Sequence, residues 1–162
     1  MAVVQEFTAR VTAASTPRQA FDFVADHRNV PRVLDGVSRW EPLSRQTRGV
    51  GARFEVEMRT LGFPLQNMLV IDIWEEAERI GWRSESGLVE QLGRWTFTPV
   101  AGGTEIELRI AYRPPGGALG GLVAGRAAGI VRRRLETALA RMRDLLAESA
   151  APPHTKSRKQ AP

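Results

Sequence analysis

The spacing of hydrophobic residues changes along the chain from a period of two to spacings of three and four. From Val37 to Tyr112, apolar and polar residues alternate in short runs. Turn-forming segments such as Gly49-Val50-Gly51 and Ala101-Gly102-Gly103 separate these runs. Alternation with regular turns is typical of an antiparallel meander. The pattern therefore predicts a sheet with one apolar, aromatic face and one charged face.

The segment before this meander is predicted to hold one strand and two short helices. Residues Val3 to Ala13 alternate as in a half-buried strand. Thr16-Pro17-Arg18-Gln19 supplies a helix N-cap, a proline at the first helical position and a glutamine placed for a capping box. The charged segment Asp26-His27-Arg28-Asn29 is expected to end this helix. A further helical turn is expected from Val30 to Leu34.

A long C-terminal helix is predicted from Gly116 to Ala147, because its second half repeats apolar residues at spacings of three and four. Toward the start of the helix, the same face becomes small, with Gly121, Ala124 and Ala128. Either a close backbone neighbour or a void that a ligand can fill would explain these residues. The glycine spacing also fits packed transmembrane helices. Arg126, however, interrupts a segment that is already too short to span a bilayer.

The predicted sheet must cover its apolar face, and the long helix is the element available to do so. The sequence therefore predicts an α+β fold with a curved antiparallel sheet wrapped around the C-terminal helix. A single domain is expected over residues 1–148, and a disordered basic tail over residues 149–162. The run from Asn67 to Trp74 is apolar in both phases, so its inward face stays open. The two alternatives are Leu69, Ile71 and Ile73, or Met68, Val70 and Trp74.

Composition narrows the class of protein. The chain has 162 residues, of which 43% are hydrophobic and 25% charged, and this suits one globular domain. The lack of cysteine excludes disulfides, and two histidines are too few for a histidine-built metal site, so neither a metal nor a cofactor is expected. The N-terminus lacks the pattern of a secretory signal, which favours a cytoplasmic protein.

The net charge of +5 is concentrated near the C-terminus. Residues 126–162 carry nine Lys or Arg but three Asp or Glu. A basic patch can attract nucleic acid or an anionic membrane. Arginines on a solvated helix face are the simpler explanation, so no nucleic-acid partner is expected, although transient contact with a membrane surface stays open.

Several segments share features with one known superfamily. They are Phe21 to Asp26 with Arg28 to Pro31, Gly49 to Phe54, Arg79 to Ser84, Trp95 to Pro99 with Gly102 to Thr104, and Tyr112 to Gly117. Together they resemble the SRPBCC (START-like) superfamily, in its bacterial polyketide cyclase/dehydrase and lipid-transport branch. The resemblance spans roughly Val4 to Leu146. It implies a helix-grip architecture, in which the sheet grips the final helix around an apolar cavity. Many relatives place an aromatic residue where Val33 stands.

The candidate ligand cavity lies between the aromatic face of the sheet and the small-residue part of the helix. Its predicted lining residues are Phe54, Val56, Met58, Trp82, Trp95, Phe97, Leu108, Ile110, Tyr112, Gly121, Ala124 and Ala128. Ordinary core packing is the alternative for each of them. Arg94, Asp72 and Asn67 are further polar candidates, although Arg94 and Asp72 are expected to face solvent. His27 is also expected to be exposed, and no catalytic signature is recognised.

Three functions remain open from the sequence. The favoured one is the binding of a hydrophobic small molecule, such as a lipid, an isoprenoid quinone or a polyketide. The resemblance also implies an aromatase or cyclase in which the cavity orders a reactive chain. Alternatively, Leu119, Leu122 and Val123 beside the arginines form a surface that docks on a membrane or a partner.

Overall fold

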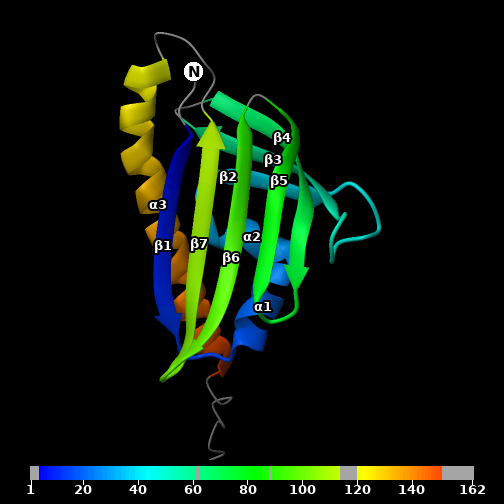
Figure 1. The fold of residues 1–162 in the computed structure, drawn as a ribbon, viewed down its shortest axis with the longest axis vertical. Coiled ribbons are helices and arrows are strands. Elements are labelled where there is room, and N and C mark those ends of the chain that lie inside the picture. Colours follow the sequence, from blue (N-terminus) through cyan, green and yellow to red (C-terminus); the bar gives the residue numbers. More distant parts are fainter. Residues whose placement is uncertain (1–3, 61–62, 88, 114–119, 151–162) are drawn as a thin grey trace, which may run out of the picture.

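A computed structural model of the protein describes residues 4–60, 63–87, 89–113 and 120–150. The elements follow the order strand, short helices, strand meander and long helix (Figure 1). They are β1 (Gln5–Ala13), α1 (Pro17–Ala25), η1 (His27–Asn29), α2 (Val30–Val33), β2 (Val37–Pro42), β3 (Arg53–Thr60), β4 (Phe63–Glu75), β5 (Arg79–Gly87), β6 (Glu90–Val100), β7 (Gly103–Arg113) and α3 (Gly120–Ala150).

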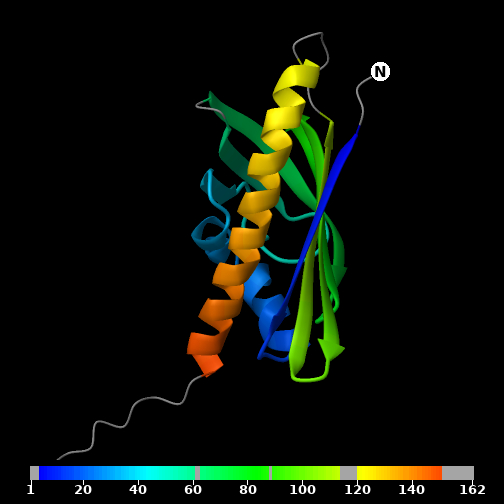
Figure 2. The same ribbon diagram turned by 90° about the vertical axis from the view of Figure 1, so that its left-hand side faces the viewer.

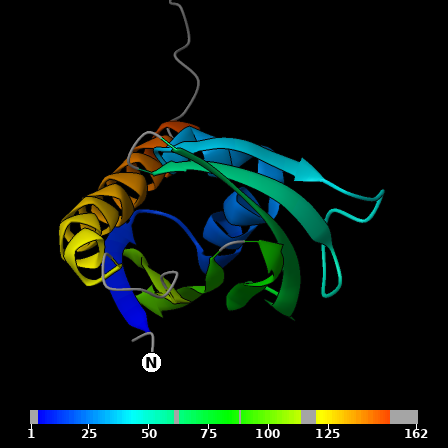
Figure 3. The same ribbon diagram turned by 90° about the horizontal axis from the view of Figure 1, so that it is seen from above.

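The strands form one antiparallel sheet of seven strands in the order β1-β7-β6-β5-β4-β3-β2. The meander from β2 to β7 pairs each strand with the next one, and β1 closes the order by pairing with β7 from Gln5 opposite Tyr112 to Ala13 opposite Thr104. The sheet curves strongly, so that β2 and β3 stand across the interior from β6 and β7 (Figure 3). The predicted helix-grip fold is confirmed.

The long helix α3 packs mainly against β1 and runs the length of the sheet (Figure 2). The predicted apolar stripe is buried in its second half. The stripe residues with buried side chains are Leu135, Ala138, Leu139, Met142 and Leu146. The helix extends to Ala150, three residues beyond the predicted end. The first two residues of the predicted tail over residues 149–162 therefore belong to the helix. The rest of that tail and the side chains of residues 120–127 lie outside the described part of the chain.

The short helices begin as the sequence predicts. Thr16 caps α1, because its hydroxyl accepts a hydrogen bond from the Gln19 backbone while the Gln19 side chain accepts one from the Thr16 backbone. The buried residues of α1 lie on one face and pack against the inside of the sheet near the turn from β6 to β7. Phe21 is fully buried there and contacts Phe97 edge to face, at 5.9 Å between ring centres. The α1 helix therefore closes one end of the concave face.

The orientation of β4, which the sequence left open, changes along the strand at a register shift against β5. Leu69 lies opposite Phe54 and faces inward, and Ile71 is buried on the same side. A shift between Ile71 and Ile73 then reverses the phase, as a β-bulge does. Trp74 consequently faces inward and contacts the α1 side chain of Phe21, so each of the two alternatives is right for one part of the strand.

Candidate functional site

The concave face of the sheet carries apolar side chains, and the convex face carries the charges. Residues paired directly across strands share a face, so Trp40, Val56 and Asn67 point to the same side. On the convex side, ion pairs link the strands, such as Arg53 of β3 with Glu85 of β5 at 2.7 Å. Within the described strands, no charged residue occupies a position of the concave face. The interior is therefore uncharged where the sheet lines it.

A small pocket lies on the concave face at the end that α1 closes. Its lining residues are Val24, Ala25, His27, Val30, Trp40, Thr47, Phe54, Ile71, Trp74, Ile80, Trp82 and Trp95. All four tryptophans of the chain contribute to it. We call this space the Trp pocket. Its volume is about 30 Å³, which is room for one or two water molecules.

The rings around the Trp pocket hold one another at defined angles. Trp40 on β2 meets Trp82 on β5 edge to face, with 6.0 Å between ring centres and an interplanar angle of 87°. Edge-to-face pairs of this kind contribute about 0.5–1.5 kcal/mol beyond the burial of their area. Gly93 lies opposite Trp82 on β6, and a Cβ atom at this position would overlap the indole. The glycine therefore makes the space in which the Trp82 ring lies flat against the sheet.

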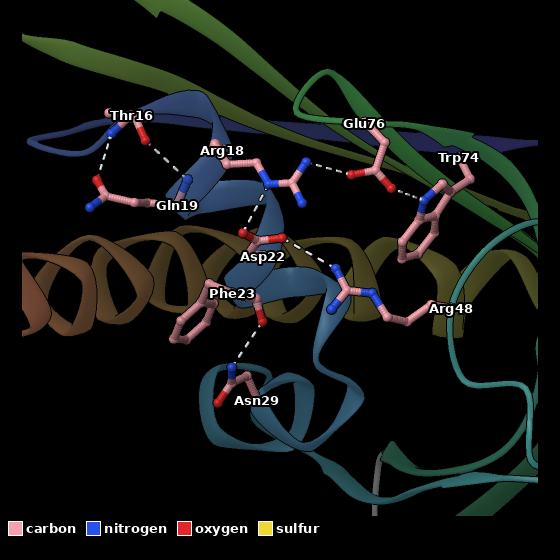
Figure 4. Close-up of polar contacts among 9 residues, drawn as sticks. All are labelled: Thr16, Arg18, Gln19, Asp22, Phe23, Asn29, Arg48, Trp74 and Glu76. Atoms are coloured by element: carbon pink, nitrogen blue, oxygen red, sulfur yellow. Dashed lines mark hydrogen bonds and ion pairs between the residues drawn. The ribbon is translucent and has the colours of Figure 1, made fainter.

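A network of ion pairs spans the outside of the Trp pocket, between α1, the loop over residues 43–52 and the turn after β4 (Figure 4). Arg48 of the loop donates to Asp22 at 3.2 Å, and its guanidinium lies 5.6 Å from the centre of the Trp74 ring. Arg18 bonds both Asp22 and Glu76, and the Trp74 indole donates to Glu76 at 2.7 Å. Because Thr47 and Trp74 line the Trp pocket, this network holds the loop closed over it.

His27 lines the Trp pocket, and the expectation that it is exposed is wrong. The Asp26 carboxylate caps η1 by accepting a hydrogen bond from the Arg28 backbone, and it also accepts two from the Arg28 guanidinium. The bonds from Arg28 lower the pKa of Asp26 to about 2. Because the two charged neighbours bond each other at the surface, the imidazole of His27 turns inward, 5.6 Å from the Phe54 ring.

Polar side chains gather at the opposite end of the concave face, where β1 begins. The Tyr112 hydroxyl donates to the Gln5 amide oxygen at 3.0 Å, and partial burial raises the pKa of Tyr112. Gln91 lies opposite Tyr112, and its backbone donates to the Ser84 hydroxyl. Asn67 follows on β4. We call these five residues the polar band, which crosses the sheet from β1 to β4.

The residues predicted to line a cavity divide into four groups. Phe54, Trp82 and Trp95 line the Trp pocket. Val56, Phe97 and Leu108 are buried in the core, while Met58, Ile110, Tyr112 and Ala128 are partly buried against it. The surroundings of Gly121 and Ala124 are not described, and neither are the side chains of Leu119, Leu122 and Val123 of the proposed docking surface. A cavity beside the small-residue part of α3 stays a prediction.

Arg94 and Asp72 are paired on the convex face. The Arg94 guanidinium and the Asp72 carboxylate form two hydrogen bonds of 3.1 Å. Arg94 lies opposite Gly81, and a Cβ atom at Gly81 would collide with the Arg94 side chain. Arg94 therefore acts as a structural link between β6 and β4, away from the concave face. This places it outside any reaction in the interior.

Several residues of the Trp pocket were not predicted from the alternation pattern. Trp40 and Trp74 lie next to register shifts in β2 and β4, which hide their phase from an alternation pattern. Thr47 belongs to a loop whose position depends on long-range contacts. A signal was nevertheless present, because each of the four tryptophans shares its strand with another inward-facing aromatic or branched residue.

The chain matches the model of the family described as polyketide cyclase / dehydrase and lipid transport over residues 4–147. It therefore belongs to this family, and the predicted membership of the SRPBCC superfamily is confirmed. No curated protein matches the chain. In the described residues, no helix combines the length and apolar composition needed to cross a membrane.

Solved structures share the fold at low sequence identity. The protein TTHA0849 from Thermus thermophilus is 19% identical with a TM-score of 0.79, and the match covers 91% of this chain and 100% of that one. The ZhuI aromatase/cyclase from Streptomyces sp. R1128 is 15% identical with a TM-score of 0.76, covering 92% and 97%. A START superfamily protein from Mycobacterium smegmatis is 16% identical with a TM-score of 0.61, covering 86% and 98%. These similarities show a common fold.

Proposed function

We propose that the protein binds a hydrophobic small molecule, such as a lipid, an isoprenoid quinone or a polyketide, between the concave face and α3. The main support is the concentration of all four tryptophans around one pocket on an uncharged concave face. Pockets that hold small molecules are typically lined by apolar and aromatic side chains with few polar groups. The family, whose description names both lipid transport and polyketide cyclisation, agrees with this class of ligand.

Ligand binding requires the Trp pocket to widen. Pockets for small organic ligands usually measure about 300–1,000 Å³, whereas the Trp pocket measures about 30 Å³. The loop over residues 43–52 is the element that can open it, since an exposed ion pair between Arg48 and Asp22 holds it in place and such a pair is weak. The proposal therefore includes movement of this loop when the ligand enters.

Native mass spectrometry of the protein purified from its own host tests the proposal directly. We expect a copurified lipophilic molecule, or an added one, at one per chain. Titration with farnesol and with a short-chain quinone should also change the emission of the tryptophans, because all four lie around one space. A protein that carries no lipophilic molecule and whose emission responds to no lipid or quinone would contradict the proposal.

An aromatase or cyclase reaction is a second candidate, and His27 is the observation in its favour. It is the titratable side chain among those that line the Trp pocket, and histidine is the side chain most often used for proton transfer. If the protein cyclises a poly-β-keto chain, His27→Gln should lower kcat by about 100-fold or more. Unchanged turnover in this variant would remove His27 from the reaction.

A further inference from the structure

The concave face has two chemically distinct ends. The end closed by α1 is aromatic, whereas the other end carries the polar band of Gln5, Tyr112, Gln91, Ser84 and Asn67. Each member of the band is neutral at pH 7 and presents a hydroxyl or an amide. A ligand that fills the space between the two ends would meet an apolar surface at one end and neutral hydrogen-bonding groups at the other.

Asn67 has hydrogen-bonding capacity that the protein leaves unused. Its side chain is 6% exposed, and its amide nitrogen donates to the Val89 carbonyl at 3.4 Å, which is a long bond. Its Oδ1 atom is buried without a partner among the described residues. A buried polar atom without a partner destabilises the folded state, so leucine at this position would serve a purely structural role better.

The space around Asn67 is shaped to hold an amide. Gly87 lies opposite Asn67 on β5, and a Cβ atom there would overlap the amide oxygen. Val56, opposite Asn67 on β3, is fully buried. The Val89 carbonyl that Asn67 contacts precedes Gln91 by two residues, so the amide lies beside the rest of the polar band. The band is therefore continuous from β4 to β6.

We infer that the polar band recognises an uncharged hydroxyl group at one end of an otherwise apolar ligand. A hydroxyl both donates and accepts, so it can satisfy the free amide oxygen of Asn67 and bond a neighbouring hydroxyl or amide of the band. A carboxylate or phosphate fits poorly, because the described strands offer no positive charge on this face and an unpaired buried charge is costly. This inference rests on the proposed binding function and specifies its ligand class as a neutral lipophilic alcohol.

Three ligands that share one hydrocarbon chain test the inference. Farnesol carries a hydroxyl, farnesyl methyl ether lacks the donor, and farnesoic acid is charged at neutral pH. Affinities come from the change in tryptophan emission. We expect farnesol to bind at least about fivefold more tightly than either of the other two, which corresponds to one well-formed hydrogen bond. Equal affinities, or tighter binding of farnesoic acid, overturn the inference while leaving hydrophobic binding intact. Failure of all three to bind overturns both.

Substitutions test whether the polar band causes the preference for farnesol. Asn67→Leu should bind farnesol as weakly as the wild type binds the ether, and should melt at the same temperature or higher, because an unpartnered amide is removed. Gln66→Leu, on the exposed face of the same strand, is the matched control and should keep the preference. A retained preference in Asn67→Leu, or equal losses for all three ligands with a lower melting temperature, overturns the role of Asn67. If Asn67→Leu fails to fold, the affinities of Tyr112→Phe for the same three ligands test the polar band instead.

Discussion

Arg48→Ala should speed ligand entry with little loss of stability. Arg48 ties the loop over residues 43–52 to α1 through Asp22 and to β4 through the Trp74 ring. The Arg48 and Asp22 side chains are 50% and 44% exposed, so the ion pair stabilises the closed loop by about 0.2–1 kcal/mol. The cation–π contact adds about 0.5–1 kcal/mol at an exposed site. Together the two contacts favour the closed loop by roughly 0.7–2 kcal/mol.

If the loop must lift before a ligand enters, removing both contacts raises the population of the open loop about 3- to 30-fold. The association rate should rise by a similar factor. Stopped-flow mixing with farnesol, followed by tryptophan emission, measures this rate. Arg10→Ala is the matched control, because Arg10 forms an ion pair of comparable exposure with Glu107 on the convex face. An association rate that stays within about twofold of the wild type in Arg48→Ala would refute the reasoning.

Three further substitutions test the packing, and one titration tests the electrostatics. Leu139→Ala should lower the free energy of unfolding by about 2–5 kcal/mol in urea denaturation, because the Leu139 side chain is 1% exposed. Ala128→Leu should leave the fold stable and weaken ligand binding. Gly93→Ala should lower the melting temperature by displacing the Trp82 ring, and an unchanged melting temperature would mean that the ring moves freely. Tyr112 is the single tyrosine, so its ultraviolet absorbance should show it titrating above 10.0 in the folded protein and nearer 10.0 in urea. Because the pKa of Tyr112 is higher in the folded protein than in the unfolded one, the free energy of unfolding should fall as the pH rises between these two pKa values.

The strand pattern was predictable from local sequence because alternation depends on nearest neighbours alone. Trp95 and Phe97 were expected to face inward opposite Arg94, and they do. The capping box at Thr16 was also predicted, since both of its partners lie within the same helical turn. Features that depend only on short-range geometry can therefore be predicted from the local sequence.

The location of the pocket was not predictable in the same way. Trp74 faces inward because a register shift reverses the phase of β4, and alternation does not reveal where an extra residue is accommodated. His27 was expected at the surface because charged residues surround it in sequence. Asp26 and Arg28 instead neutralise each other locally and leave the imidazole free to turn inward.

The pairing of β1 with β7 has a consequence for the way the chain folds during synthesis. Gln5 and Tyr112 are paired although 107 positions separate them, and the other long neighbour of β1 is α3, which comes last in the chain. During synthesis β1 must therefore wait until β7 has been made before it gains a partner. Contacts between residues so far apart in sequence slow folding and leave an unpaired edge in the meantime. Nascent chains that end before β7 should consequently expose β1 and be the species that chaperones bind.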